Sequence, residues 1–379
     1  MHVLITGTRG IPANYGGFET FAQDLSLFMR SRGHEVTVYC QASKGEKLRE
    51  DHWKGIRRVL IPVGNGPVGT MEFDLRSILH SIKQGGVVLT LGCNTGMFNV
   101  LYRLRGVPNL LNMDGVEWER DKWPGYAKAW LRINKWFGAR AATHLIADHP
   151  EMGKILLDDV SAKKIEVIPY GADAVLSAPV APIEKLGLRA KQYHLVIARS
   201  EPENSILEIV GTYARRHRGI PLVILGRYTR EGTPYQNLVL DAAGPETLFT
   251  GPIYDRSIVN SLRFHARTYF HGHRVGGTNP SLVEALAAGN AVVAHSNPFN
   301  RWVAGDGALY FKQPEDLDEI IERVNSDNAK LVAMEAASRK RHSEAFTQEM
   351  ILTAYEKILL RFSNGNAVLA PEAGLGYRG

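Results

Sequence analysis

The sequence predicts an α/β protein of two domains, each built around a parallel sheet. Its 379 residues, 44% of them hydrophobic, suffice for two cores of ordinary size. Short apolar runs alternate with amphipathic helical patterns in two series, which is typical of βαβ units. The runs of the first series cover residues 2–6, 36–40, 58–63, 87–92, 109–113, 143–147 and 165–169. Those of the second cover residues 194–198, 221–225, 247–250, 267–270, 291–295 and 308–311.

The domain boundaries follow from the gap between the two series. We expect a first domain over residues 1–173, a linker without a strand pattern over 174–190, and a second domain over 191–345. A helix over 346–362 would cross back to the first domain, and a glycine-rich tail occupies 363–379. Two such Rossmann-like domains would face a central cleft at the carboxyl ends of their strands, where open α/β sheets bind ligands.

Composition narrows the class of protein. A net charge of +6 and a pI near 9.2 suit phosphorylated ligands or an anionic membrane, and are too mild and dispersed to indicate nucleic-acid binding. Cys40 and Cys93 form no disulfide framework and no metal-ligand spacing, which predicts a reducing compartment. Without a signal-peptide pattern or a run of ~20 apolar residues, we expect a cytoplasmic protein, soluble or at the inner face of the plasma membrane.

The most informative segment, residues 271–290, reads HGHRVGGTNPSLVEALAAGN and predicts a ligand-binding helix start. Gly276 and Gly277 permit a sharp turn with no Cβ in the way of a ligand. Asn279 is a good N-cap, and Pro280 suits the first helical position. The alternative is an ordinary helix start that happens to follow a glycine pair.

Four residues of this segment could contact a bound ligand through a side chain or a backbone amide. The N–H groups of Ser281 and Leu282 would be free to attract phosphate at the positive helix end. Glu284 lies on the same helix face and could accept hydrogen bonds from sugar hydroxyls. His271 could contact phosphate or sugar, although a loop histidine is more often structural.

In each predicted domain, the loop after the first strand carries residues that could bind phosphate. The opening loop contains Arg9, Gly16 and Gly17, but it lacks the G-x-G-x-x-G spacing of a dinucleotide site. Arg199 directly follows the strand over 194–198, where an arginine can bind a diphosphate bidentately. The alternatives are a surface arginine at position 9 and, for Arg199, an ion pair with a nearby glutamate.

A further group of candidate residues follows the strand over residues 109–113. Asp114 and Glu117 form the best carboxylate pair of the first half for an acceptor hydroxyl, and Trp118 beside them could stack on a sugar. The alternative is a solvated acidic loop.

Residues 122–140 combine tryptophans with lysines and arginines at helical spacing. Tyr126, Trp130, Ile133 and Phe137 share one stripe, which suits a helix lying on anionic lipid. The alternative is that this stripe packs on the protein's own sheet.

At the level of motifs, the chain resembles family 4 glycosyltransferases of GT-B fold. The resemblance rests on IPYGAD at 168–173 and on residues 279–289. More narrowly, GTRGIPANYGGFET at 7–20, ARSEPEN at 198–204 and HGHRVGGTNPS at 271–281 resemble the rhamnosyltransferase-type subgroup of bacterial surface polysaccharide synthesis.

This resemblance implies that the second domain holds a nucleotide-sugar donor and the first holds the acceptor. It also implies retention of anomeric configuration, with no metal and no cofactor. Glu284 matches the second glutamate of the family's E-x7-E motif, which binds the nucleotide ribose, and Arg199 matches the diphosphate-binding basic residue. Gly16 and Gly17 match the glycine loop that approaches the donor phosphates.

Three positions depart from the family pattern. The first glutamate of E-x7-E is replaced by Gly276, and the usual lysine after Arg199 is replaced around Asn204. The histidine common after the fifth strand is missing, and Asp114 stands in its neighbourhood. Donor hydroxyl contacts and part of the diphosphate charge balance must therefore come from other residues.

The expected function is transfer of a sugar from a nucleotide-diphosphate donor to a glycan or a lipid-linked oligosaccharide, with dTDP-L-rhamnose as the favoured donor. Two alternatives stay open. One is a GT-B epimerase that acts on a sugar nucleotide without an acceptor, and the other is a non-catalytic nucleotide-sugar-binding scaffold.

Overall fold

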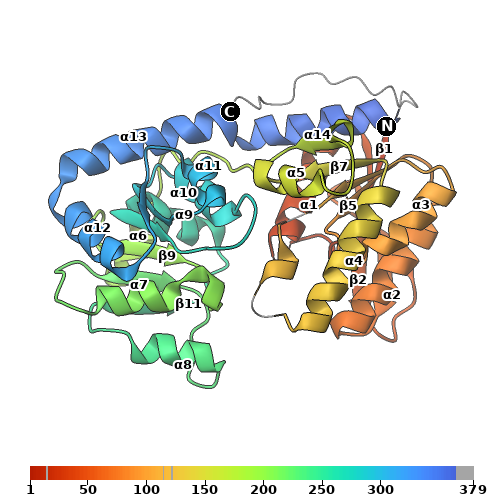
Figure 1. Cartoon of the computed structure of the whole chain (residues 1–379). Coiled ribbons are helices and arrows are strands. Elements are labelled where there is room, and N and C mark those ends of the chain that lie inside the picture. Colours follow the sequence, from red (N-terminus) through yellow and green to blue (C-terminus); the bar gives the residue numbers. More distant parts are fainter. Residues whose placement is uncertain (14–15, 114, 121–122, 364–379) are drawn as a thin grey trace. The chain divides into compact units, whose positions relative to one another are not determined.

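The computed structural model describes residues 1–13, 16–113, 115–120 and 123–363 (Figure 1). The chain divides into two compact units. The first comprises Met1–Glu119, Trp123–Pro169 and the residues from Ile351 onward, and the second contains Tyr170–Met350. Each unit has its own sheet and its own buried core.

The first unit contains an eight-stranded sheet of order β3-β4-β2-β1-β5-β6-β7-β8. Its strands are β1 (His2–Thr6), β2 (Glu35–Ser43), β3 (Arg49–Trp53), β4 (Ile56–Val63), β5 (Val87–Leu91), β6 (Asn109–Asn112), β7 (His144–Ala147) and β8 (Ile165–Val167). All neighbours pair in parallel except β3 and β4. The strand order reverses between β1 and β5, so the topological switch point of this unit lies at their carboxyl ends.

Strand β3 is the one strand of this sheet that the hydrophobic pattern did not predict. Its sequence, REDHW, is polar, and it pairs antiparallel with β4 through a tight turn. Lys54 and Gly55 both have positive φ, 48° and 78°, as a two-residue hairpin turn requires. An edge strand needs few buried residues, so its apolar signal is weak.

Helices cover this sheet, and the last of them arrives from the far end of the sequence. They are α1 (Gly17–Ser31), α2 (Gly66–Ser81), α3 (Val100–Leu104), α4 (Gly125–Ala141), α5 (Pro150–Leu156) and α14 (Gln348–Ser363). From Ile351 onward, α14 belongs to the first unit. The Tyr355 ring lies 4.7 Å from that of Phe21, and its hydroxyl accepts a hydrogen bond of 2.7 Å from Asn112.

The second unit contains a fully parallel six-stranded sheet of order β11-β10-β9-β12-β13-β14. Its strands are β9 (His194–Ile197), β10 (Leu222–Leu225), β11 (Thr247–Gly251), β12 (Thr268–His271), β13 (Val292–His295) and β14 (Leu309–Phe311). This is the strand order of a Rossmann fold, with its switch point between β9 and β12. All six predicted strands are confirmed.

The helices of the second unit connect these strands. They are α6 (Ala181–Glu184), α7 (Ile206–Tyr213), α8 (Pro234–Asp241), α9 (Arg256–His265), α10 (Pro280–Ala287), α11 (Pro298–Ala304), α12 (Pro314–Ser326) and α13 (Asn328–Ala345). Along β9 and β12, Val196 pairs with Phe270, and both residues are buried. Strands buried on both faces read as continuous apolar runs, which explains why the sequence revealed them.

The segment expected to be a linker, residues 174–190, is instead part of the second unit. It forms α6, and Ile183 and Leu188 lie in the same hydrophobic core as Leu262 of α9. The N–H of Val175 donates to the carbonyl of Ala287 at 2.9 Å. Isolated apolar residues among prolines gave no periodic signal, although burial of each stabilises the unit by roughly 1.5–3 kcal/mol.

Candidate functional site

The candidate donor site lies at the switch point of the second sheet. The loop after β9 carries Arg199, and the loop after β12 leads through Gly276 and Gly277 into α10. Because β9 and β12 are neighbours in the sheet, the two loops leave it side by side. This is where open α/β sheets bind ligands.

The start of α10 is capped as the sequence predicted, and the cap changes the interpretation of the nearby amides. The Asn279 side chain accepts hydrogen bonds from the Ser281 N–H at 3.0 Å and from the Ser281 hydroxyl at 2.8 Å. The Leu282 N–H donates to the Asn279 carbonyl at 3.1 Å. The expectation that both N–H groups are free was therefore wrong in this structure, because a side chain that caps a helix satisfies the donors that phosphate would use.

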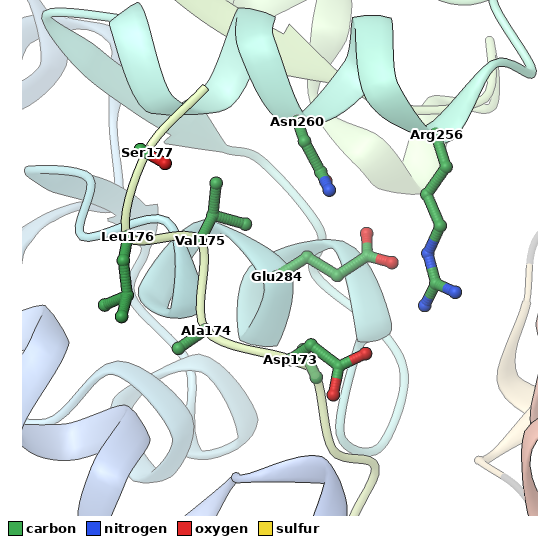
Figure 2. Close-up of a pocket in the computed structure, with 9 residues that line it drawn as sticks. Asp173, Ala174, Val175, Leu176, Ser177, Arg256, Asn260 and Glu284 are labelled. Carbon is green, nitrogen blue, oxygen red and sulfur yellow. The ribbon is translucent and has the colours of Figure 1, made fainter. Parts of the chain in front are cut away.

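Glu284 projects from α10 into a cavity of about 430 Å³ (Figure 2). Its carboxylate accepts a hydrogen bond from Arg263 of α9, whose side chain is only 5% exposed, whereas that of Glu284 is 36% exposed. One side of the carboxylate is thus held by a buried cation while the other faces the cavity. Such a positioned acceptor suits the hydroxyl groups of a ribose or a sugar.

The remaining walls of this cavity come from α9 and from the chain that precedes α6. Figure 2 shows Arg256 and Asn260 projecting from α9 around Glu284, with the backbone of residues 173–177 opposite. The lining therefore combines a carboxylate, a guanidinium and an amide with a length of backbone. Polar groups of three kinds within one cavity suit a nucleoside, which presents hydroxyls and a base edge.

Arg199 is exposed at the carboxyl end of β9. Its carbonyl oxygen accepts hydrogen bonds from the Asn204 side chain at 2.9 Å and from the Glu201 N–H at 2.8 Å, which close the loop. Within the described ranges, its guanidinium forms no ion pair with Glu201 or Glu203, the alternative weighed from the sequence. Asn204, in place of the family lysine, thus orders the arginine's backbone and adds no charge.

His271 is a buried residue at the carboxyl end of its strand. It is 1% exposed at the end of β12, and its ring stacks on His273 with centroids 4.2 Å apart. Burial, with a smaller contribution from His295, lowers the pKa of His271 to about 3. A neutral, buried imidazole agrees with the structural alternative for this residue and offers no positive charge to a phosphate, whereas a contact with a sugar hydroxyl stays a prediction.

The Gly276–Gly277 turn is open. Gly276 has φ of 153°, and a Cβ there would meet no atom of the described structure within 4 Å. Space alone therefore does not exclude a glutamate at this position. The backbone conformation does disfavour it, because side chains rarely adopt this φ.

In the first unit, the loop after β1 forms a hydrogen bond to the helix that follows it, α1. Gly16, with φ of 95°, precedes α1, which begins at Gly17. The buried carboxylate of Glu19 accepts the N–H of Arg9 at 3.1 Å. The Arg9 side chain is exposed, as either interpretation of this residue requires.

Of the two carboxylates predicted to contact the acceptor, the structure describes only Glu117. Asp114 lies outside the described residues. Glu117 begins a short 3-10 helix, Glu117–Glu119, and accepts a hydrogen bond of 3.4 Å from the Trp123 indole. Trp118 is 5% exposed, with the Lys135 ammonium 5.5 Å from its ring centroid, so it is a core residue and the expectation that it stacks on a sugar was wrong.

Three of the four stripe residues of helix α4 are exposed to solvent, whereas Trp130 is half-buried and its indole N–H donates to the Asn94 carbonyl at 3.2 Å. Tyr126 is 80% exposed, Ile133 48% and Phe137 38%. The buried face is formed by other residues, among them Leu131 and Asn134. The alternative that the stripe packs on the protein's own sheet is therefore excluded for these three side chains.

Sequence reasoning did not find the partners of Glu284. Arg263, Arg256 and Asn260 share α9, at positions 256, 260 and 263, the spacing of one helix face. Their polar character within an otherwise ordinary helix was the available signal. Nothing local, however, indicates that this face lies against α10.

None of the described helices is long and apolar enough to cross a bilayer. No group of three or more histidine, cysteine or acidic side chains within the described ranges is arranged to hold a metal ion.

Comparisons with known proteins agree on the fold. Residues 1–173 match a family described as "Domain of unknown function (DUF1972)". A phosphatidyl-myo-inositol mannosyltransferase of Mycolicibacterium smegmatis is 26% identical over 311 residues, which cover 77% of this chain and 75% of that protein. The chain is thus similar to this mannosyltransferase over about three quarters of both sequences.

Solved structures support the same GT-B architecture at low sequence identity. A sucrose-phosphate synthase from Thermosynechococcus elongatus superposes with a TM-score of 0.81 and 16% identity, covering 96% of this chain and 99% of that one. The Anabaena protein HepE, solved in complex with UDP and glucose, gives 0.74 and 15%, covering 95% and 99%. The predicted fold of two Rossmann-like domains is confirmed.

Most of the family match lies in the first unit, whereas the candidate donor site lies in the second; residues 170–173 of the match belong to the second unit, and Ala172 and Asp173 among them line the Glu284 cavity. The match ends at Asp173. Arg199, Arg263 and Glu284 all lie beyond it, in the second unit. The site's chemistry therefore rests on the second unit's own geometry.

Proposed function

We propose that the chain is a glycosyltransferase that takes its sugar from a nucleotide-diphosphate donor. The observation that carries this proposal is the Glu284 cavity of about 430 Å³ beside α10, in the second domain of a GT-B fold. Glu284, held by Arg263, would accept the ribose hydroxyls of the donor. Arg199 at the end of β9 would bind the diphosphate.

The leaving group is the nucleoside diphosphate. When the bond between the anomeric carbon and the phosphate oxygen breaks, negative charge develops on that oxygen. A bidentate guanidinium at Arg199 would stabilise this charge, and the dipole of α10 could add up to ~2 kcal/mol. Phosphate bound directly at the helix start would have to compete with the Asn279 cap for the Ser281 N–H.

The proposed stereochemical course is retention, without a metal. The acceptor hydroxyl forms its bond to the anomeric carbon on the face from which the phosphate departs, and its proton passes to the departing phosphate. No protein nucleophile takes part. This proposal rests on the family resemblance and requires only donor binding and charge stabilisation from the residues named above.

For substrates, we propose dTDP-L-rhamnose as donor and a glycan or lipid-linked oligosaccharide as acceptor, at the cytoplasmic face of the membrane. Gly276, in place of the family glutamate, fits a donor whose hydroxyl pattern differs from that of glucose. The exposed aromatic side chains and nearby cations of α4 fit contact with anionic lipid, where a lipid-linked acceptor would lie.

A thermal-unfolding screen with dTDP-, UDP- and GDP-sugars tests the donor, since a ligand of the native state must raise its stability. We expect dTDP-L-rhamnose to give the largest shift and to support transfer to a lipid-linked acceptor. Transfer from a UDP- or GDP-sugar alone would contradict the donor assignment. Conversion of the donor without acceptor would indicate an epimerase, and binding without any turnover a scaffold.

On the acceptor side, we propose that Asp114 or Glu117 contacts the attacking hydroxyl. Asp114→Asn should lower product formation far more than donor affinity measured by calorimetry. A parallel fall in both quantities would show that the residue was assigned wrongly. Glu119→Gln, an exposed carboxylate of the same segment, is the matched control.

A further inference from the structure

A second cavity of about 290 Å³ lies in the second unit and shares no lining residue with the Glu284 cavity. Its walls come from the loop after β12, the ends of β13 and β14, and the first turns of α7 and α12. It therefore also opens at the carboxyl edge of the sheet, the edge that binds ligands in this class of fold. None of the residues discussed for donor binding lines it.

Cationic groups from three successive strand ends meet in this cavity. Arg274 follows β12, His295 ends β13 and Lys312 follows β14. Burial, Arg274 and Lys312 together lower the pKa of His295. Neither Arg274 nor Lys312 forms an ion pair with a carboxylate in the part of the chain that the structure describes.

The cavity fixes one of these cations firmly. Nη2 of Arg274 donates to the carbonyl of Pro202 at 3.0 Å, and its backbone N–H donates to the carbonyl of Glu203 at 2.8 Å. The carboxylate of Asp316 on α12 accepts the backbone N–H groups of residues 312 and 313 at 3.0 Å each. The guanidinium is thus placed beforehand, which lowers the entropic cost of binding an anion.

The opposite wall offers acceptors for hydroxyl groups. Glu208 lines the cavity, and its Oε2 is buried and accepts no hydrogen bond from any described residue. Ser205, also lining it, is the N-cap residue directly before α7, the helix that carries Glu208. A buried carboxylate oxygen without a donor costs free energy, and a ligand hydroxyl would supply that donor.

The net charge of the residues that line this cavity indicates which class of ligand it suits. The cations of Arg274 and Lys312 and the carboxylate of Glu208 leave a single net positive charge while His295 is neutral, and the first turns of two helices add partial positive charge. A phosphomonoester with hydroxyl groups satisfies both walls, since its phosphate matches the cations and its hydroxyls match Glu208. A plain anion would leave Glu208 without a partner.

We propose that this cavity binds a sugar phosphate, with the phosphate between Arg274 and Lys312 and the sugar hydroxyls at Glu208 and Ser205. The site is separate from donor binding and does not depend on the proposed glycosyl transfer. Arg274 lies two residues before Gly276, so an occupied site would also hold the start of the loop that leads to α10.

Calorimetric titration of the full-length protein tests the proposal with glucose 1-phosphate, glucose 6-phosphate, inorganic phosphate and glucose as probes. We expect the sugar phosphates to bind more tightly than inorganic phosphate, and glucose to give no measurable binding. Arg274→Ala and Lys312→Ala should each weaken sugar-phosphate binding at least tenfold. Arg230→Ala and Lys340→Ala, which remove exposed cations of the same unit, are the matched controls.

Further variants test the hydroxyl contact at Glu208 and show which of the two cavities binds the sugar phosphate. Glu208→Gln should weaken the sugar phosphates and leave inorganic phosphate unaffected or tighter, because a negative charge is removed. Glu284→Ala and Arg199→Ala should leave sugar-phosphate affinity unchanged. If neither sugar phosphate binds, or if binding is lost with Glu284 or Arg199 and kept without Arg274, the proposal is overturned. Arg274 and Lys312 are exposed, so their variants should fold, which thermal unfolding checks.

Discussion

Glu284 is held by Arg263, a cation from the neighbouring helix whose own side chain is 5% exposed. The pair has a double role. Arg263 orients the carboxylate toward the cavity, and Glu284 provides the counter-charge of a guanidinium that cannot reach solvent. Changes at position 284 therefore affect ligand binding and stability together, and an experiment must separate the two.

We predict that Glu284→Ala lowers donor affinity more than tenfold, because the ribose hydroxyls lose their acceptor. It should also lower the free energy of unfolding by about 1–3 kcal/mol, since Arg263 is left without its partner. Calorimetry with the donor and denaturant unfolding measure the two effects. Glu319→Ala, an exposed carboxylate on α12, is the control.

The double variant Glu284→Ala/Arg263→Leu removes both charges at once. We expect it to recover much of the lost stability while donor binding stays impaired, because the apolar replacement needs no counter-charge. Recovery of donor affinity along with stability would show that Glu284 acts only by holding the fold.

Arg199 is predicted to bind the diphosphate through two parallel hydrogen bonds. Arg199→Ala should cost more than tenfold in donor affinity or turnover, and Arg199→Lys should restore only part of it, because the planar fork is lost. Steady-state kinetics with the donor varied provide the measurement. Arg323→Ala removes an exposed arginine elsewhere in the second unit, and wild-type behaviour of both Arg199 variants would refute the assignment.

Helix α4 is predicted to bind anionic membranes. Tyr126→Ser combined with Ile133→Ser should lower co-sedimentation with anionic vesicles at least tenfold, since burial of each large side chain is worth roughly 1.5–3 kcal/mol. Binding of the wild type should rise with anionic lipid and weaken with salt. Val332→Ser, which alters an exposed apolar residue of the second unit, is the control. Equal recovery with neutral and anionic vesicles would argue against the proposal.

Buried histidines predict acid sensitivity of the fold. Burial lowers the pKa of His144, His194 and His271 to about 3. In the unfolded chain each takes up a proton near pH 6.5, so the unfolded state binds more protons and stability falls as pH drops below 6.5. At pH 5 each histidine should cost about 2 kcal/mol.

The measurement is the free energy of unfolding as a function of pH. His194 is bonded to Thr268 and to Asn325, at 2.8 Å in the latter case, and His194→Gln should flatten the slope below pH 6.5 while lowering stability at pH 7. His217→Gln, whose ring is 84% exposed, should leave the slope unchanged. An identical slope in both variants would show that His194 is not a source of acid sensitivity.

Local signals were enough for most of the architecture. Every apolar run became a strand, and for most of them the reason is burial on both faces, which composition alone reveals. The exception is β3, which has no apolar run and forms through the Lys54–Gly55 turn and its pairing with β4. Ile183 shows the same limit, since a single buried residue in a proline-containing segment has no period to detect.

At the candidate site, the sequence by itself determined the features that depend on neighbours along the chain: the Asn279 cap, the open turn at Gly276 and the place of Glu284 on its helix. Only the tertiary structure decided exposure and partnership. It placed Arg263 beside Glu284, buried Trp118 and His271, and turned Tyr126 outward. Helical periodicity and capping arise within a few residues, whereas burial depends on which element packs against which, and no residue carries that information alone.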